Sequence, residues 1–209
     1  EQEDVFEVIE KLFNKLFTKF SKFKIQNEKF PKITFADAML KYGTDKPDLR
    51  NPLLIYEVSD VFKRDDVKFD IFKNLVNKGN VVRAIIAPQT SDKPRSFFDN
   101  IDKWSKDQGA SGLAYFTLEQ KSDLSAKGPI GKFFSSDSLK EIIKITGAKV
   151  KDTIFFSCGS KKEVENILSL ARNKIAEELK LINHNQFSFC WIIDYPMYEI
   201  NEETKKIQF

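Results

Sequence analysis

The stretch KYGTDKPDLRNP, residues 41–52, gathers charged side chains and backbone-directing residues in one short connection. Asp45 and Asp48 have the chemistry to bind a cation or an amine, whereas Lys46 and Arg50 have the chemistry to hold a phosphate. An ordinary capped turn explains the same residue types: Gly43 ends a helix, Asp45 makes an Asx turn, Pro47 rigidifies it, and Arg50 pairs with an acid. On general grounds the turn is the more frequent explanation, so we treat the loop as a candidate site only.

Two other segments are candidates for anion binding. In SAKGPIGKFF, Lys127 and Lys132 flank a Gly-Pro turn whose glycines permit close approach to the backbone. In APQTSDKPR, Lys93 and Arg95 fall in the first turn of an expected helix, where phosphates often bind. A hairpin-type connection and an exposed turn are the alternative interpretations of these two segments.

The remaining reactive residue types do not form a recognisable catalytic set. The sequence lacks a Gly-rich phosphate loop, a nucleophile near a histidine, and ligands at metal spacing. His184 lies in the polar connection INHNQ, which is typical of a surface turn rather than a metal site. Cys158 and Cys190 each lie in an apolar run, which favours two buried thiols in a reducing compartment over a disulfide.

Composition limits the classes of protein that the chain can represent. Lys plus Arg number 34 against 31 Asp plus Glu, a net charge of +3, which is too balanced for a strongly basic nucleic-acid binder. A local basic face remains compatible with this balance. No apolar run reaches the length of a membrane span, and the acidic start is unlike a signal peptide. The absence of an initial Met suggests a piece of a longer protein.

Hydrophobic periodicity predicts the elements that must position these segments. Helices are expected over residues 4–20, 34–43, 94–110, 135–148 and 160–181. Strands are expected over residues 53–59, 81–88, 112–119, 152–159 and 186–200, the last halted or bulged at Pro196, with a returning strand from residue 207. The intervening segments 121–129, 128–134 and 201–206 are expected to be a loop, a short extended piece and a turn.

Local signals predict the ends of two helices. Thr34 is expected to cap the second helix at its start, and Gly43 suits a left-handed residue past its end. Either Ser136 or Asp137 is expected at the start of the helix that Gly147 ends. Strands and helices alternate through the middle of the chain, so the fold class is α+β or α/β. Charge-rich connections suggest boundaries near residues 60 and 160.

Several segments together resemble one family. FPKITFADAMLKYGTDKPDLR, GASGLAYF, KGPIGKFF and SFCWIIDYPMYE are similar, in this order, to segments of bacterial-type aspartyl-tRNA synthetases. EQEDVFEVIEKLF resembles the helix that follows the second class II signature motif in that family. The resemblance covers essentially the whole chain. Where the family usually has a Gly-Gly pair after the second strand, this chain reads PQTSD.

The resemblance implies a domain organisation. Residues 1–59 correspond to the catalytic-domain segment after the second motif, 60–160 to the GAD insertion domain, and 161–209 to the return into the catalytic domain. The implied fold class is α+β. A mixed α/β insertion domain, a sheet with packed helices, joins flanking helices and strands of a class II antiparallel-sheet catalytic domain. The GAD domain also occurs in a subunit of the tRNA-dependent amidotransferase.

The resemblance also implies a function. The parent protein would be a cytoplasmic aspartate–tRNA ligase, a homodimer that uses ATP and Mg²⁺ to join L-aspartate to tRNA. The family's ATP-binding arginines lie in the second and third motifs, so this fragment is expected to bind no cofactor or metal and to be inactive alone. The alternative is a non-catalytic GAD tRNA-binding or assembly module, as in the amidotransferase subunit.

No catalytic residue is carried over from the family to this fragment. The residues that remain as candidates for bracing the loop or contacting tRNA are Asp45, Lys46, Arg50, Lys127 and Lys132.

Overall fold

The computed structural model describes residues 1–120, 122–200, 204 and 206–208, and it divides into two compact units. The larger unit comprises Leu40–Thr44 and Asn51–Ile182. The smaller unit comprises Glu1–Met39, Asp45–Arg50 and Asn183–Phe209. The charged loop at residues 41–52 is therefore shared between the two units: its ends belong to the larger one and its centre to the smaller one.

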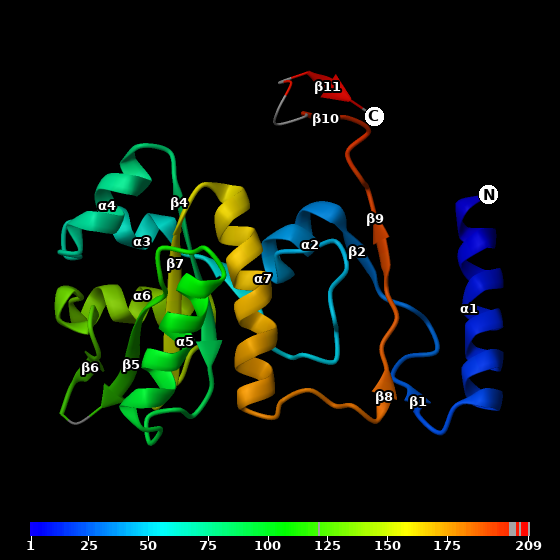
Figure 1. Ribbon diagram of the computed structural model, residues 1–209, viewed down its shortest axis with the longest axis horizontal. Coiled ribbons are helices and arrows are strands. Elements are labelled where there is room, and N and C mark those ends of the chain that lie inside the picture. The colour runs from blue at the N-terminus through cyan, green and yellow to red at the C-terminus, as the bar shows by residue number, and fades with distance from the viewer. Residues whose placement is uncertain (121, 201–203, 205, 209) are drawn as a thin grey trace. The chain divides into compact units, whose positions relative to one another are not determined.

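A five-stranded sheet forms the centre of the larger unit (Figure 1). In spatial order its strands are β3 (Ile55–Glu57), β4 (Val81–Ala87), β7 (Thr153–Gly159), β5 (Ala114–Gln120) and β6 (Leu124–Lys127). Every neighbouring pair is antiparallel, and β4 and β7 pair along their full length, from Val81 opposite Gly159 to Ala87 opposite Thr153. Apolar side chains from both faces of β4 and β7 are buried, which agrees with the continuous apolar runs in the sequence.

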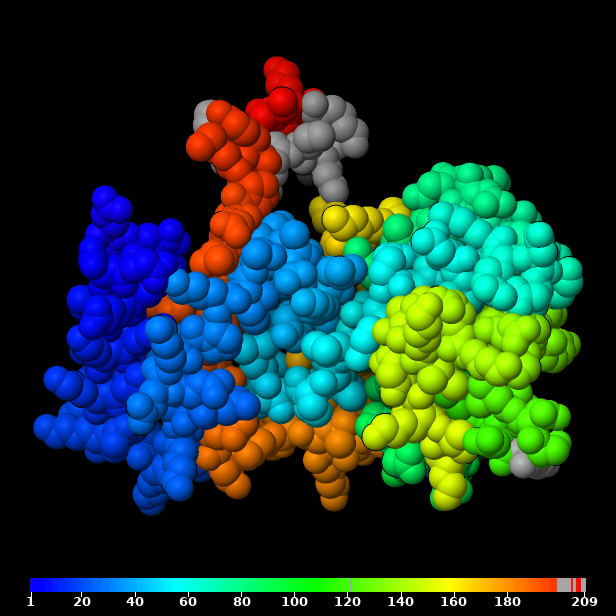
Figure 2. Space-filling view, turned by 180° about the vertical axis from the view of Figure 1, so that it is seen from behind, coloured from blue at the N-terminus to red at the C-terminus, as the bar shows by residue number. Residues whose placement is uncertain are grey.

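Helices cover both faces of this sheet. On one face lie α3 (Ser59–Lys63), α4 (Asp70–Asn77), α6 (Ser136–Thr146) and the 3₁₀ turn η1 (Gly131–Phe133). In Figure 2 this layer forms the visible surface of the larger unit, in cyan and yellow-green. On the other face lie α5 (Arg95–Asp107) and α7 (Lys161–Glu178). The side chains of β4 point alternately to the two faces of the sheet. Val82 and Ala84 pack against the first group of helices, and Ile85 and Ala87 pack against the second.

The smaller unit contains α1 (Gln2–Phe20), the start of α2 (Phe35–Tyr42), and three two-stranded pairs. The first two pairs, β1 (Lys24–Ile25) with β8 (Gln186–Phe187) and β2 (Lys32–Thr34) with β9 (Trp191–Ile193), are parallel. The third, β10 (Glu199–Ile200) with β11 (Ile207–Gln208), is antiparallel.

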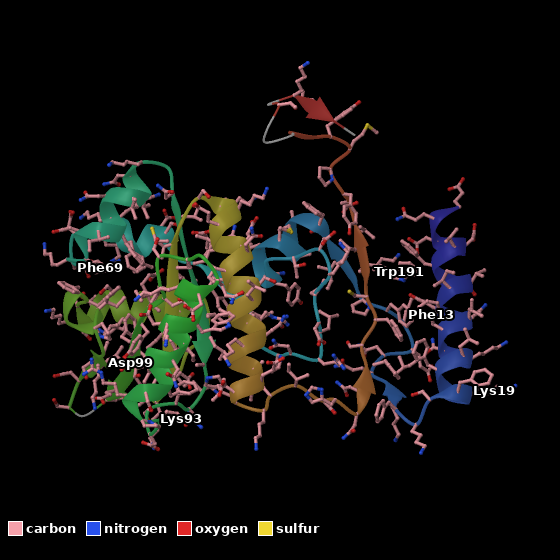
Figure 3. The ribbon with its side chains drawn as sticks, in the orientation of Figure 1. Phe13, Lys19, Phe69, Lys93, Asp99 and Trp191 are labelled. Carbon is pink, nitrogen blue, oxygen red and sulfur yellow. The ribbon has the colours of Figure 1, made fainter. Side chains whose placement is uncertain are left out.

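Aromatic rings fill the space between α1 and the strands of the smaller unit. Phe13 and Phe17 of α1 lie 5.3 Å and 4.9 Å from the ring of Phe189. The Glu10 carboxylate accepts hydrogen bonds from Trp191 Nε1 at 3.0 Å and from the Phe30 N–H at 3.2 Å. Figure 3 labels Phe13 and Trp191 on these facing elements. One face of α1 thus packs against residues near the other end of the sequence.

Most predicted elements are confirmed. The helices predicted at 4–20, 34–43, 94–110, 135–148 and 160–181 correspond to α1, α2, α5, α6 and α7, and the predicted strands to β3, β4, β5 and β7. Thr34 Oγ1 accepts the Asp37 N–H at 3.1 Å, and Gly43 and Gly147 have φ of 70° and 71°. These outcomes confirm the predicted cap and the predicted helix ends.

Other predictions were wrong, each for a local reason. The loop predicted at 121–129 includes β6, because Leu124 and Ala126 alternate with polar residues and pair with β5. The extended piece predicted at 128–134 contains η1 instead. The strand predicted at 186–200 is halted around Pro196 as predicted, since β9 ends at Ile193 and β10 begins at Glu199, but it is also broken between β8 and β9. α3 and α4 were not predicted, and most of the turn predicted at 201–206 lies outside the described residues.

The sheet unit extends beyond the predicted 60–160 segment at both ends. β3 pairs with β4, and α7 packs on β4 and β7, so both elements belong to the same compact unit as the middle of the chain. The fold is α+β with an antiparallel sheet.

The start of α6 is tied to the loop after α3. α6 begins at Ser136, one of the two residues predicted at its start, and its N-cap is Ser135, whose Oγ accepts the Ser138 N–H at 3.0 Å. The same hydroxyl donates to Asp66 Oδ2 at 2.5 Å, and Asp66 also accepts Arg64 Nε at 2.8 Å. Both hydrogen bonds hold the pKa of Asp66 well below its ordinary value, and the bond from Arg64 has the larger effect.

We expect Asp66→Asn to lower the stability of the larger unit at neutral pH and to lower it less in acid. A carboxyl whose pKa is depressed by folding stabilises the fold above its unfolded pKa of about 4, and that stabilisation is lost as the pH falls. Urea unfolding at about pH 7 and about pH 3 should therefore show the gap between wild type and variant shrinking in acid. Asp60→Asn, in an exposed pair with Lys63, is the control. An equal gap at both pH values would contradict this assignment.

Candidate functional site

One end of the charged loop packs against α7 without room for a side chain. Gly43 has φ of 70°, and a Cβ on it would lie 2.4 Å from the Glu165 carbonyl oxygen. A backbone atom at that distance cannot move aside cheaply, so both conformation and contact require glycine here. Next to it, the ring of Tyr42 lies 4.9 Å from the guanidinium carbon of Arg172.

Arg172 also hydrogen-bonds to the other end of the loop. Arg172 is 2% exposed, and its guanidinium donates from Nε to the Leu53 carbonyl at 2.6 Å and from Nη2 to the Asn51 carbonyl at 2.6 Å. Asn51 Nδ2 in turn donates to the Arg172 carbonyl oxygen at 3.0 Å. Sequence analysis did not select Arg172. Its signal was an arginine between Leu168 and Ile175 on the apolar face of a helix.

The centre of the loop, in the smaller unit, is internally paired. Arg50 donates from Nε to Asp48 Oδ1 at 2.9 Å and from Nη2 to Oδ2 at 2.7 Å, and the hydrogen bond from Arg50 to Asp48 raises the pKa of the guanidinium. Lys46 lies 3.2 Å from Asp45, which also accepts the Tyr195 hydroxyl at 3.4 Å. The pKa of Tyr195 is raised by partial burial and then by Asp45. The predicted pairing of Arg50 with an acid is confirmed. The Asx turn is made by Asp48, whose Oδ1 accepts the Arg50 N–H at 2.9 Å, and not by the predicted Asp45, because the residue two positions after Asp45 is a proline without an N–H.

The other two candidate segments meet at one cavity of about 500 Å³ in the larger unit. Lys93 and Arg95 reach it from the start of α5, and Lys127 reaches it from the end of β6. Figure 3 labels Lys93 just before α5 and Asp99 within that helix. The described residues that line the cavity are Ser91, Lys93, Arg95, Phe98, Asp99, Tyr115, Thr117, Glu119, Lys127, Gly128 and Pro129.

Lys132, in contrast, is not among the residues that line the cavity. It is exposed in η1, with its amine 5.1 Å from the ring centre of Phe133. The two lysines of the SAKGPIGKFF segment therefore occupy different surroundings. Sequence analysis also missed the cavity residues of β5, although their alternation along the strand is a period-two signal.

The PQTSD connection forms a tight turn without glycine. Gln89 adopts φ of 52°, and its N–H donates to Asp152 Oδ1 at 2.9 Å. Thr90 Oγ1 donates to the Ala87 carbonyl at 3.0 Å, and Asp152 Oδ2 accepts the Lys149 N–H at 2.8 Å. Side-chain hydrogen bonds here support a left-handed backbone that glycine adopts more easily.

Both cysteines are free thiols rather than a disulfide, as predicted, but they are half-buried and not fully buried. Burial raises the pKa of Cys158 to about 11 and also raises that of Cys190, so neither is activated as a thiolate. Among the described residues, no group of three or more His, Cys, Asp or Glu side chains gathers as metal ligands would. Over the same part of the chain, no helix combines the length and the apolar character needed to span a membrane.

Comparisons with known proteins identify similar sequences. The GAD domain family model matches residues 72–168. The aspartate–tRNA(Asp/Asn) ligase of Pelagibacter ubique is 62% identical over 209 residues, which is 100% of this chain and 35% of that protein. The ligases of the same name from Methylorubrum populi and Wolbachia pipientis are each 47% identical over 209 residues, covering 35% and 34% of those proteins. The chain thus spans about a third of the length of these relatives, and the predicted resemblance is confirmed along all of it.

We expect Arg172→Ala to destabilise the larger unit by about 3 kcal/mol, because buried carbonyl groups lose charged hydrogen-bond donors and a cavity opens. Lys174→Ala, on the same helix but in an exposed pair with Glu178, should change stability by at most about 0.5 kcal/mol. Urea unfolding measured by tryptophan fluorescence and circular dichroism gives both values. Equal effects of the two substitutions would show that Arg172 does not fasten the loop.

Proposed function

We propose that this chain is the GAD-containing segment of an aspartate–tRNA ligase. The observation that carries the proposal is the identity of 62% over all 209 residues to a protein of that name. The similarity includes the flanks outside the GAD match at 72–168, where YGTDKPDLR and WIIDYPM lie.

The reaction of the parent protein would proceed in two steps. A carboxylate oxygen of L-aspartate attacks the α-phosphorus of ATP, and pyrophosphate leaves as the aspartyl-adenylate forms. A hydroxyl of the terminal ribose of tRNA then attacks the aspartyl carbonyl, and AMP leaves. Mg²⁺ would neutralise charge on the phosphates. In this proposal the parent is a cytoplasmic homodimer, and the residues that hold ATP lie in parts of it outside these 209 residues.

The segment itself would support that reaction. Residues 60–160 form the insertion domain in this proposal, and 1–59 and 161–209 are pieces of the catalytic domain. The contacts of Arg172 with Asn51 and Leu53 fix the point where the chain enters the sheet unit. Asp45, Lys46 and Arg50 would brace the loop between these parts or line the approach of tRNA.

A GAD module of an amidotransferase subunit is the weaker alternative. Its GAD domain would explain residues 72–168 but not the similarity of the flanks to ligases. The two proposals differ in activity: only a ligase forms an adenylate.

A pyrophosphate exchange assay tests the proposal. We expect the 209-residue chain to exchange no pyrophosphate into ATP in the presence of aspartate, because adenylate formation needs residues from the rest of the parent. The same segment placed in the frame of a full-length ligase, such as that of Pelagibacter ubique, should restore exchange. Exchange by the 209 residues alone, or a folded chimera without activity, would contradict the proposal.

A further inference from the structure

We propose that the cavity beside the start of α5 binds a nucleotide of single-stranded RNA. The inference deepens the proposed function, on which it rests for the kind of partner. The site is assembled from three segments: the start of α5, the strand β5, and the Gly-Pro turn after β6.

The cavity exists because the helices on this face do not cover the end of the sheet. On this face α7 packs on β4 and β7, so α5 is the helix that remains to cover β5 and β6. Tyr115, Thr117 and Glu119 alternate along β5, so their side chains share this face and form the floor. A volume of about 500 Å³ lies in the range of sites that take small molecules.

Two aromatic side chains, Phe98 and Tyr115, line the cavity. The rings of Phe98 and Tyr115 are stacked, with centroids 5.0 Å apart and an interplanar angle of 13°. Phe98 is buried and Tyr115 is half-buried, so the tyrosine is the ring that a ligand meets. Proteins bind single-stranded nucleic acids by stacking bases on aromatic side chains of this kind.

Cations surround the entrance. Lys93, Arg95 and Lys127 contribute three positive charges, against the two carboxylates of Asp99 and Glu119. Arg95 lies 3.3 Å from Asp99, and Lys127 lies 3.9 Å from Glu119, in pairs whose basic partners are 88% and 78% exposed. Such exposed pairs are weak, so a phosphate can take over either cation.

The combination fits a nucleotide better than a bare anion. An isolated phosphate would leave the aromatic floor unused and would lie near two carboxylates. A nucleotide offers an aromatic base for Tyr115, a phosphate for the lysines and arginine, and amino and hydroxyl hydrogens that Asp99 and Glu119 can accept. A strand rather than a free nucleotide is favoured because the three cations come from two separate segments, the start of α5 and the end of β6.

Fluorescence anisotropy with a labelled, unstructured RNA oligonucleotide tests the inference on the 209-residue chain. We expect Tyr115→Leu to weaken binding about tenfold, by loss of stacking. Lys127→Ala should weaken binding and reduce the slope of log K against log salt by about 0.7, the value for one phosphate contact on a single strand. Lys132→Ala removes the same charge outside the cavity and is the matched control, for which we expect no change.

Competition distinguishes the possible ligands. AMP should displace the oligonucleotide only weakly, and inorganic phosphate should not displace it at comparable concentration. Displacement by phosphate as effective as by AMP would reduce the site to a simple anion site and overturn the inference. An oligonucleotide that does not bind, or equal losses for Lys127→Ala and Lys132→Ala, would overturn it too. None of these results touches the exchange assay, so the proposed ligase function is judged separately.

Discussion

The burial of one guanidinium, that of Arg172, is the constraint on which the larger unit depends. Removing such a charge from water is costly unless hydrogen bonds replace the lost solvation. Here the carbonyl groups of Asn51 and Leu53 and the ring of Tyr42 replace it. Because these partners lie on both sides of the charged loop, one side chain of α7 fixes where the loop leaves and re-enters the unit.

A second buried arginine, Arg83, lies between the sheet and α7. Arg83 of β4 is 3% exposed and contacts Glu57 of β3 at 3.0 Å and Glu165 of α7 at 3.1 Å. The backbone of the same Glu165 faces Gly43. The edge strand β3, the neighbouring strand β4 and α7 are thus joined by charges that would be expensive to separate. This explains why β3 and α7 belong to the sheet unit although the sequence placed boundaries at about residues 60 and 160.

The sequence left two roles open, a rigid connection and a ligand-binding site. The charged loop fits the first role and the cavity fits the second. In the loop, Arg50 is paired with Asp48 and Lys46 lies near Asp45, which suits a rigid connection. At the cavity, in contrast, the cations are exposed and lie over aromatic carbon. Chemistry suited to a ligand therefore lies on the sheet of the larger unit, while the charged loop is mainly a rigid connection in the chain.

The sequence by itself determined the kinds of element, the left-handed glycines at 43 and 147, and the family resemblance, because each depends on local periodicity, turn chemistry or residue order. It did not predict that Lys127 joins Lys93 and Arg95 while Lys132 does not, since that depends on how β5 and β6 pair. It also did not predict the role of Arg172, whose partner Leu53 is 119 residues away. Only the tertiary structure decides such contacts, because strand order and helix packing bring together distant residues, and no local signal identifies the partner.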